Sequence, residues 1–198
     1  MKNLSKILIG AFILGIFFVG CKKDDDDAPK NQMTYNETEY DLSQGFLENY
    51  GTWDRSEAYN FGLVLLSSGF IVHEIDGEID SLSGTGHGIV FDIYTSNPDK
   101  LEIGDYTYDS NSTENAGTFD YAGGVFNYSM LTEDGEEFEI NGGKLKVVQN
   151  GDIYELNFDC TTEEGKPITG FYKGSIKYYD MRDNKKSSKQ IGKGNYLN

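Results

Sequence analysis

The chain has 198 residues, of which 37% are hydrophobic and 14% aromatic, so one or two domains with a substantial core are expected and wholesale disorder is excluded. It carries 33 Asp and Glu against 17 Lys and Arg, a formal net charge of −16 at pH 7. No nucleic-acid partner is expected, because affinity for a phosphate backbone comes mainly from Lys and Arg. The sequence contains no Rossmann, P-loop, zinc or nucleophile-elbow motif.

The N-terminal segment has the plan of an export signal. Two lysines precede an apolar run over residues 7–19, which is shorter than the roughly 20 residues that a membrane-spanning helix needs. Residues 1–20 are therefore predicted to be a signal peptide. The residues at its end are Phe18-Val19-Gly20-Cys21. They resemble the lipobox of bacterial lipoproteins, which implies a lipid on Cys21 and, through that lipid, a membrane as partner.

Residues 21–34 continue as a charged segment with nothing to bury, and are predicted to be a disordered acidic tether. Lys22 and Lys23 precede four aspartates. A cysteine followed by lysine and an acidic run resembles the signal that sends Bacteroidota lipoproteins to the outer face of the outer membrane. The resemblance implies a lipid-anchored protein at the cell surface. With Cys21 acylated, Cys160 has no intramolecular partner, so the domain is expected to stand without a disulfide.

Residues 35–180 are predicted to form one all-β domain. Apolar and polar side chains alternate with a period of two, and Gly, Asn and Asp turns separate about 8–10 short strands. This pattern is typical of a single antiparallel β-sandwich or flattened barrel. A closed barrel of the calycin or lipocalin kind is the alternative. Residues 181–198 carry several basic residues and little apolar material, and are predicted to be a flexible tail.

The pattern also predicts individual pairings. Asn150-Gly151 tolerates positive φ in a tight turn and marks a hairpin between two alternating segments. A second hairpin is expected between residues 59–65 and 70–75, across a Ser-Ser-Gly turn. One last strand is expected to carry an apolar face formed by Tyr172, Ile176 and Tyr178.

A second resemblance concerns the domain itself. It lies in residues 101–108, 142–147, 150–151, 154–158 and 165–170, together with Gly174. These turn glycines and core aromatics resemble the C-terminal half of small β-rich Bacteroidota lipoproteins of unknown function. The resemblance implies an all-β surface lipoprotein and carries over no catalytic residue.

Two acidic segments have oxygen ligands at alternate positions, a pattern from which a calcium site can be built. The candidate ligands are Asp76, Glu78 and Asp80 in the first segment and Asp109, Asn111 and Thr113 in the second. Neither segment has the EF-hand glycine at the sixth position, so solvated turns are the favoured interpretation and calcium is the alternative. No other cofactor or metal is expected.

The sequence predicts no catalytic residue and no enzyme. His73 is in register with apolar neighbours at an expected core edge, and His87 lies in a Gly-rich segment. Two histidines without a third ligand do not make a zinc site. Cys160 falls on the apolar face of its strand, where a thiol stays protonated and inert. Among so many acids, a carboxylate pair of the glycosidase kind has no specific signature.

Aromatic side chains are the remaining candidates for contacts with a ligand. Trp53 is predicted to pack at the core edge, with a ligand contact as the alternative. The sequence thus favours a non-enzymatic binding or accessory module at the cell surface, for a glycan, a small molecule or a protein ligand. Two alternatives are a lipocalin-like barrel that binds a small apolar ligand and a surface hydrolase that acts on glycans.

Overall fold

The computed structural model describes residues 29–52, 56–75 and 77–182, and every regular element in these ranges is a β-strand. The all-β prediction is confirmed. The twelve strands are β1 (Gln32–Tyr35), β2 (Thr38–Asp41), β3 (Gln44–Thr52), β4 (Tyr59–Leu66), β5 (Phe70–Ile75), β6 (Glu78–Thr95), β7 (Gly104–Tyr108), β8 (Thr118–Ser129), β9 (Asp134–Gln149), β10 (Tyr154–Thr162), β11 (Pro167–Gly174) and β12 (Lys177–Asp180). The first strand begins inside residues 21–34, the segment predicted as a tether, because Met33 is buried and β1 pairs with β11.

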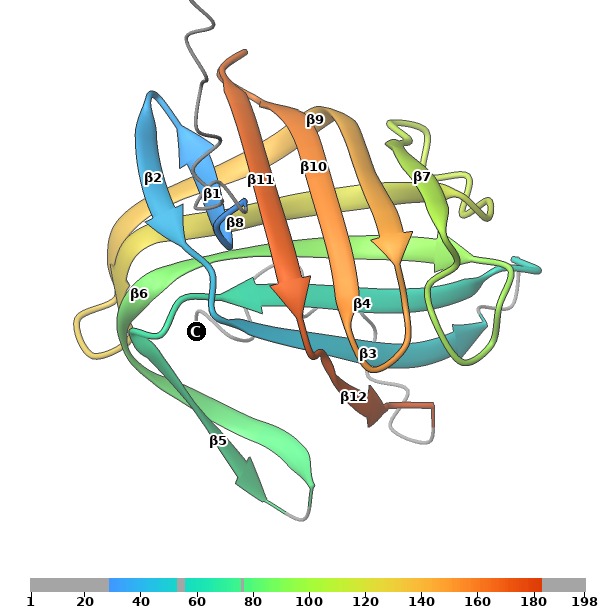
Figure 1. Cartoon of the computed structure of the whole chain (residues 1–198), viewed down its shortest axis with the longest axis horizontal. Coiled ribbons are helices and arrows are strands. Elements are labelled where there is room, and N and C mark those ends of the chain that lie inside the picture. Colours follow the sequence, from blue (N-terminus) through green and yellow to red (C-terminus); the bar gives the residue numbers. More distant parts are fainter. Residues whose placement is uncertain (1–28, 53–55, 76, 183–198) are drawn as a thin grey trace, which may run out of the picture.

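One curled sheet holds the domain together. Its hydrogen-bonded order is β12-β3-β4-β6-β8-β7-β9-β10-β11-β1-β2, and β5 pairs separately with β6. The sheet curls into a half-barrel, so that β9, β10 and β11 cross over β3, β4 and β6 (Figure 1). Most neighbours are antiparallel, while β12 with β3 and β7 with β8 run parallel. This arrangement is consistent with both the sandwich and the barrel expected from the sequence.

Irregularities in the long strands accompany the curl. The ladder between β6 and β8 shifts register twice, and the ladder between β9 and β10 shifts near Thr161. Close to that point Gly143 has a φ of +109°, and a Cβ there would lie 2.4 Å from the Cα of Cys160. Bulges of this kind bend a strand and increase its twist, which allows a long sheet to close on itself.

The main core fills the concave side of the curled sheet. Leu63 and Leu65 of β4 enter it together, because alternate residues of a strand share a face. The ring of Phe91 meets the rings of Phe119 and Phe158 at centroid distances of 5.4 and 5.6 Å. All of these side chains are buried. The concave side is therefore occupied by packed core residues.

The predicted hairpin at Asn150-Gly151 is confirmed, since β9 and β10 pair antiparallel with Val147 opposite Leu156. The connection is longer than a two-residue turn. It spans residues 150–153, and φ is positive at Gly151 but not at Asn150. The dipeptide predicted the position of the hairpin correctly but not the length or the conformation of its loop.

The predicted hairpin between residues 59–65 and 70–75 is wrong. β4 and β5 both pair with β6, which is 18 residues long, and not with each other. Val90 of β6 lies opposite Val64 of β4, and Leu82 of β6 lies opposite Val72 of β5. The chain crosses from β4 to β5 at Gly69, where a Cβ would lie 2.0 Å from a backbone oxygen of β6. Alternation identified both strands but not their partners.

The predicted last strand is two separate strands. β11 ends before Ser175, whose carbonyl accepts a hydrogen bond from the Tyr172 hydroxyl at 2.8 Å. β12 then joins the other edge of the sheet beside β3. Tyr172 is consequently buried in the main core, whereas Tyr178 is 41% exposed. The two tyrosines do not share one apolar face.

Candidate functional site

An apolar pocket of about 120 Å³ lies on the outer face of the sheet, the face directed away from the main core. It is covered by β5 and the first part of β6, residues 70–75 and 78–84, which project from the body as a hairpin that we call the arm (Figure 1). An engineered apolar cavity of about 150 Å³ stays dry and binds benzene. The pocket is thus of the size that holds one ring or a short alkyl chain.

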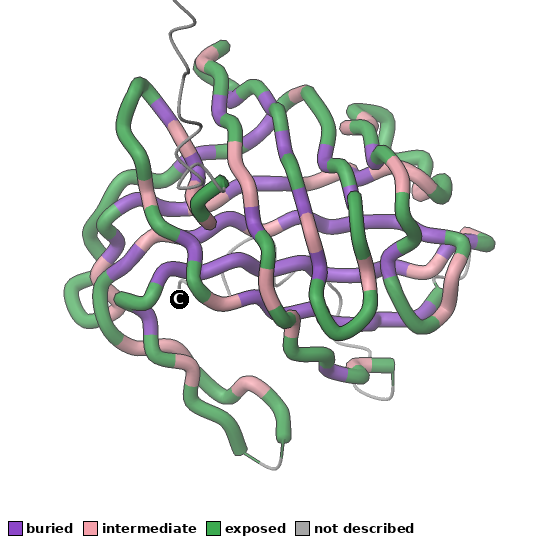
Figure 2. Tube along the Cα trace, in the orientation of Figure 1, coloured by how far each residue is buried: buried purple, intermediate pink, exposed green. Residues whose placement is uncertain are grey.

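The floor of the pocket follows from a second hydrophobic face on the central strands. Val64 and Leu66 alternate with the core leucines of β4, so this strand is buried on both sides (Figure 2). Phe46 of β3, Val90 of β6 and Val125 of β8 continue the apolar floor across the sheet. A strand covered on only one face would carry polar residues at these positions.

The roof is the inner side of the arm, which contributes Val72, Ile79 and Leu82. The other side faces solvent, with Ile71 and Ile75 more than half exposed. The sequence placed His73 at a core edge beside these isoleucines, and this expectation is wrong because His73 is exposed on the arm. Its imidazole Nε2 instead lies 2.7 Å from the Ser83 hydroxyl, across the arm.

A polar contact, which we call the latch, ties the arm to β12. Lys177 donates to both carboxylate oxygens of Glu74 at 2.5 Å, and the Tyr179 hydroxyl donates to one of them at 2.5 Å. These bonds, with that to Lys177 the largest cause, lower the pKa of Glu74 from its usual value of 4.5. Since Tyr179 is part of the second hydrophobic cluster, the latch fixes the arm over the pocket floor.

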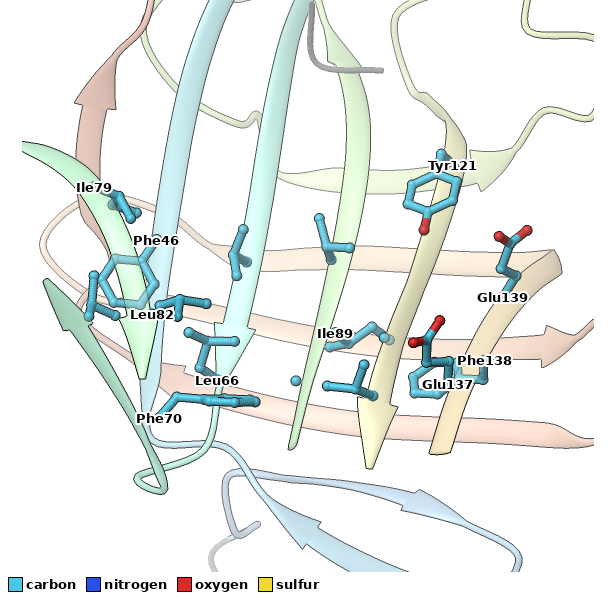
Figure 3. A pocket seen from close by; sticks show the side chains of 16 residues that line it. Phe46, Leu66, Phe70, Ile79, Leu82, Ile89, Tyr121, Glu137, Phe138 and Glu139 are labelled. Carbon is cyan, nitrogen blue, oxygen red and sulfur yellow. The ribbon is translucent and has the colours of Figure 1, made fainter. Parts of the chain in front are cut away.

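The opposite end of the pocket is acidic. Figure 3 shows Phe46, Ile79 and Leu82 at one end and Tyr121, Glu137 and Glu139 at the other. Burial, followed by the charges of Glu139 and Glu137, raises the pKa of Tyr121 to about 12. Within the described residues, neither glutamate side chain has an ion pair or hydrogen bond. The pocket therefore joins an apolar interior to a negatively charged opening.

Further along the strands the outer face becomes polar while it stays buried. Glu48, Asn60 and Asp92 are at most 6% exposed. Tyr50 donates to Glu48 at 2.7 Å, and the Asn60 amide donates to Asp92. Both pairs are hydrogen-bonded, although the Asn60 amide oxygen has no hydrogen-bond partner among the described residues. The charge of Asp92 extends the negative potential toward Tyr121.

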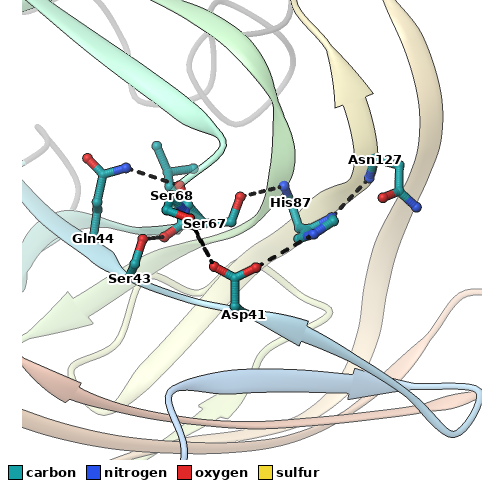
Figure 4. A network of polar contacts seen from close by, with 8 residues as sticks. Asp41, Ser43, Gln44, Ser67, Ser68, His87 and Asn127 are labelled. Atoms are coloured by element: carbon teal, nitrogen blue, oxygen red, sulfur yellow. Dashed lines mark hydrogen bonds and ion pairs between the residues drawn. The ribbon is translucent and has the colours of Figure 1, made fainter.

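A polar network around His87 lies at the edge of the arm (Figure 4). Its Nδ1 accepts the backbone N–H of Asn127 at 3.1 Å, and its Nε2 faces an oxygen of Asp41 at 3.9 Å. The backbone N–H of His87 donates to the Ser67 hydroxyl at 2.9 Å. Burial lowers the pKa of His87, against a smaller opposing effect of Asp41. His87 is thus a half-buried neutral imidazole in a strand and not an exposed loop residue.

This network does not have the geometry of a serine hydrolase. A serine nucleophile needs its hydroxyl within hydrogen-bond reach of an imidazole nitrogen. In the described part of the chain no hydrogen bond joins a serine hydroxyl to the His87 ring. The Ser68 hydroxyl instead contacts Asp41 directly, at 3.5 Å. The residues join β2 to the central strands.

The first set of predicted calcium ligands belongs to the arm and to a residue between its two strands in the sequence. Glu78 and Asp80 lie exposed on β6 in the arm, and Asp76 falls outside the described residues. Within the described ranges no three His, Cys, Asp or Glu side chains are grouped so that they could hold a metal.

The second calcium candidate is a capped turn. The Asp109 carboxylate accepts the backbone N–H groups of Asn111 at 3.0 Å and of Thr113 at 2.9 Å, and also the Thr113 hydroxyl. These bonds, led by that from the hydroxyl, lower the pKa of Asp109. The carboxylate oxygens are therefore engaged within the turn itself.

Cys21 and Trp53 also fall outside the described residues. Within those residues, no helix has the length and apolarity to cross a membrane. Sequence reasoning missed the pocket, because its walls come from six strands and its floor shares strands with the core. The one signal that it left is the unbroken apolar run of β4, where a strand exposed on one face would alternate.

The chain was compared with family models, curated proteins and solved structures, and none of them matches it.

Proposed function

We propose that this protein is a lipid-anchored, non-enzymatic binding module at the outer surface of the outer membrane, and that the pocket under the arm is its ligand site. The pocket carries the proposal. It is an apolar hollow with a few polar groups at its opening, the usual composition of a small-molecule site. A ligand there lies outside the packed core, so binding does not require the domain to open.

The location rests on the first residues of the chain. The run that ends at Cys21 resembles a lipobox, and the Lys-Asp segment after it resembles a surface export signal. One acyl chain binds a membrane only reversibly, so a stable anchor needs a second chain. Labelling with radioactive palmitate tests the anchor. The wild type is expected to be labelled and Cys21→Ala is not. Cleavage by protease added to intact cells tests surface display, and full resistance would contradict it.

A neutral aromatic probe tests the ligand site. The Cys21→Ala chain avoids lipid and keeps the domain, and benzyl alcohol is expected to bind it with a Kd on the order of 1 mM, the affinity of a ring-sized ligand. Val90→Phe fills the floor and Leu82→Trp fills the roof, and both residues are only half-buried. Each substitution is expected to abolish binding seen by NMR titration. Equal binding by both folded variants would overturn the assignment.

A further inference from the structure

We infer that the ligand of this pocket is a small amphiphilic cation, whose apolar ring or short chain lies under the arm and whose protonated amine lies at the open end beside Tyr121, Glu137 and Glu139. The inference rests on the proposed function of the pocket and names the chemical class of its ligand.

The apolar half of the ligand is set by the interior. Phe46, Val64 and Leu66 form one wall and Val72 and Leu82 the other, and all are hydrocarbon side chains. A volume of about 120 Å³ accommodates one ring or a short chain, which favours a small molecule over a segment of another protein. The polar lining residues Tyr121, Glu137 and Glu139 lie on β8 and β9, so the charged end of a ligand is directed toward these strands.

The cationic half is set by the opening. Glu137 and Glu139 project from the same side of β9, two residues apart, and both also line a second hollow. That hollow adds Glu163 and Glu164, so the acids form a continuous strip. No lysine or arginine belongs to the described lining of either hollow.

The charges around the opening act on neighbouring groups. Lys166, beside the second hollow, is already held by Glu164 at 2.7 Å. Burial, followed by the charges of Asp120, Glu163 and Glu139, raises the pKa of Tyr108, as the same kind of field does at Tyr121. An ammonium group at this position gains attraction from at least two carboxylates, whereas a carboxylate there meets repulsion.

Three probes with one ring and different charges test the inference on the Cys21→Ala chain. Phenethylammonium is expected to bind about tenfold more tightly than 3-phenylpropionate at low salt, with benzyl alcohol between them. The preference is expected to shrink in about 0.5 M NaCl, because the opening is exposed to solvent. Equal affinities for the cation and the anion would overturn the inference.

Matched variants separate this inference from the proposed function. Glu137→Gln and Glu139→Gln together are expected to remove most of the cation preference, measured as the ratio of the affinities for phenethylammonium and 3-phenylpropionate. Glu136→Gln removes an exposed acid from the same strand that does not line the pocket, and is expected to keep the preference. If the neutral probe binds and no charge preference is seen, the inference of a cationic ligand is overturned and the proposed ligand site stands. No binding of any probe overturns the ligand site itself.

Discussion

Lys177 and Glu74 are 103 residues apart in the chain, yet the ammonium of the first lies 2.5 Å from both carboxylate oxygens of the second. This contact joins β12, at one edge of the sheet, to the arm over the pocket. Within the arm, β5 pairs with the first part of β6, and a few apolar side chains of the arm, most of them half-buried, pack against the outer face of the sheet. The latch therefore adds to the bonds at the base of the arm, where Gln44 donates to the Phe70 carbonyl and Met130 to the Gly84 carbonyl, and it holds the outer part of the roof.

The latch is expected to make the arm sensitive to acid. The folded-state pKa of Glu74 is below 4.5, so the stability from this group is present above about pH 4.5 and is lost as the pH falls through the folded value. The difference in Tm between wild type and Glu74→Gln is therefore expected to be largest near pH 7 and to shrink as the pH falls below about 4.5. Glu136→Gln removes one exposed carboxylate outside the latch and serves as the control for the loss of a single negative charge. A difference that stays constant with pH would contradict the role of the latch.

Gly143 is expected to be indispensable at its bulge. An alanine there would need a φ of +109° and would clash with Asp159 and Cys160 of β10, so Gly143→Ala is expected to lower the free energy of unfolding by at least about 2 kcal/mol. The adjacent Gly142 has no atom within 4 Å of a built Cβ, and Gly142→Ala is expected to be nearly neutral. Urea denaturation of both variants compares them, and equal effects would refute the argument.

The thiol of Cys160 is expected to be unreactive in the folded chain. It is 2% exposed, and burial raises its pKa to about 12, so the thiolate fraction at pH 8 is very small. In the Cys21→Ala chain, iodoacetamide is expected to label Cys160 only after denaturation. Rapid labelling under native conditions would show that β10 opens.

Phe91 is expected to anchor the main core. Its ring contacts those of Phe119 and Phe158, and Phe91→Ala is expected to lower the free energy of unfolding by about 3–5 kcal/mol through the cavity that it leaves. Leu131 is 91% exposed, so Leu131→Ala serves as a control with an expected change within about 0.5 kcal/mol. Similar losses in the two variants would mean that the concave side is not the main core.

Alternation of side chains was sufficient to predict the fold class, because the faces of β9 and β10 differ clearly in polarity. It could not predict which strands pair. β4 pairs with β6 rather than with β5, as at Val64 and Val90, because β6 is long enough to pair with both strands. Nothing in the residue types of Val64 or Val90 indicates which strand is the partner. The turn residues Asn150-Gly151 predicted the hairpin between β9 and β10 correctly. The turn at Gly69 led to a wrong hairpin, because there the glycine permits a close approach to the backbone of β6.

The pocket was beyond sequence reasoning for a related physical reason. Its walls combine Phe46, Val72 and Val125, which meet only because β3, β5 and β8 are brought together by the curl and the arm. The acidic opening is equally hidden, since Glu137 and Glu139 are two among many exposed acids in the chain. Charge becomes informative only when the apolar pocket beside it is known.

The long-range pairing of β1 with β11 also bears on how the chain reaches its folded state. The bonds between Asn31 and Lys173 span 142 residues, and β3 gains its outer neighbour only when β12 has been made. Folds dominated by such distant contacts close slowly, because much loop entropy is lost before the contacts form. The domain cannot complete either edge of its sheet until its last strands have left the ribosome. For the exported precursor that we propose, this delay is useful, since translocation machinery that threads an unfolded polypeptide meets no prematurely closed domain.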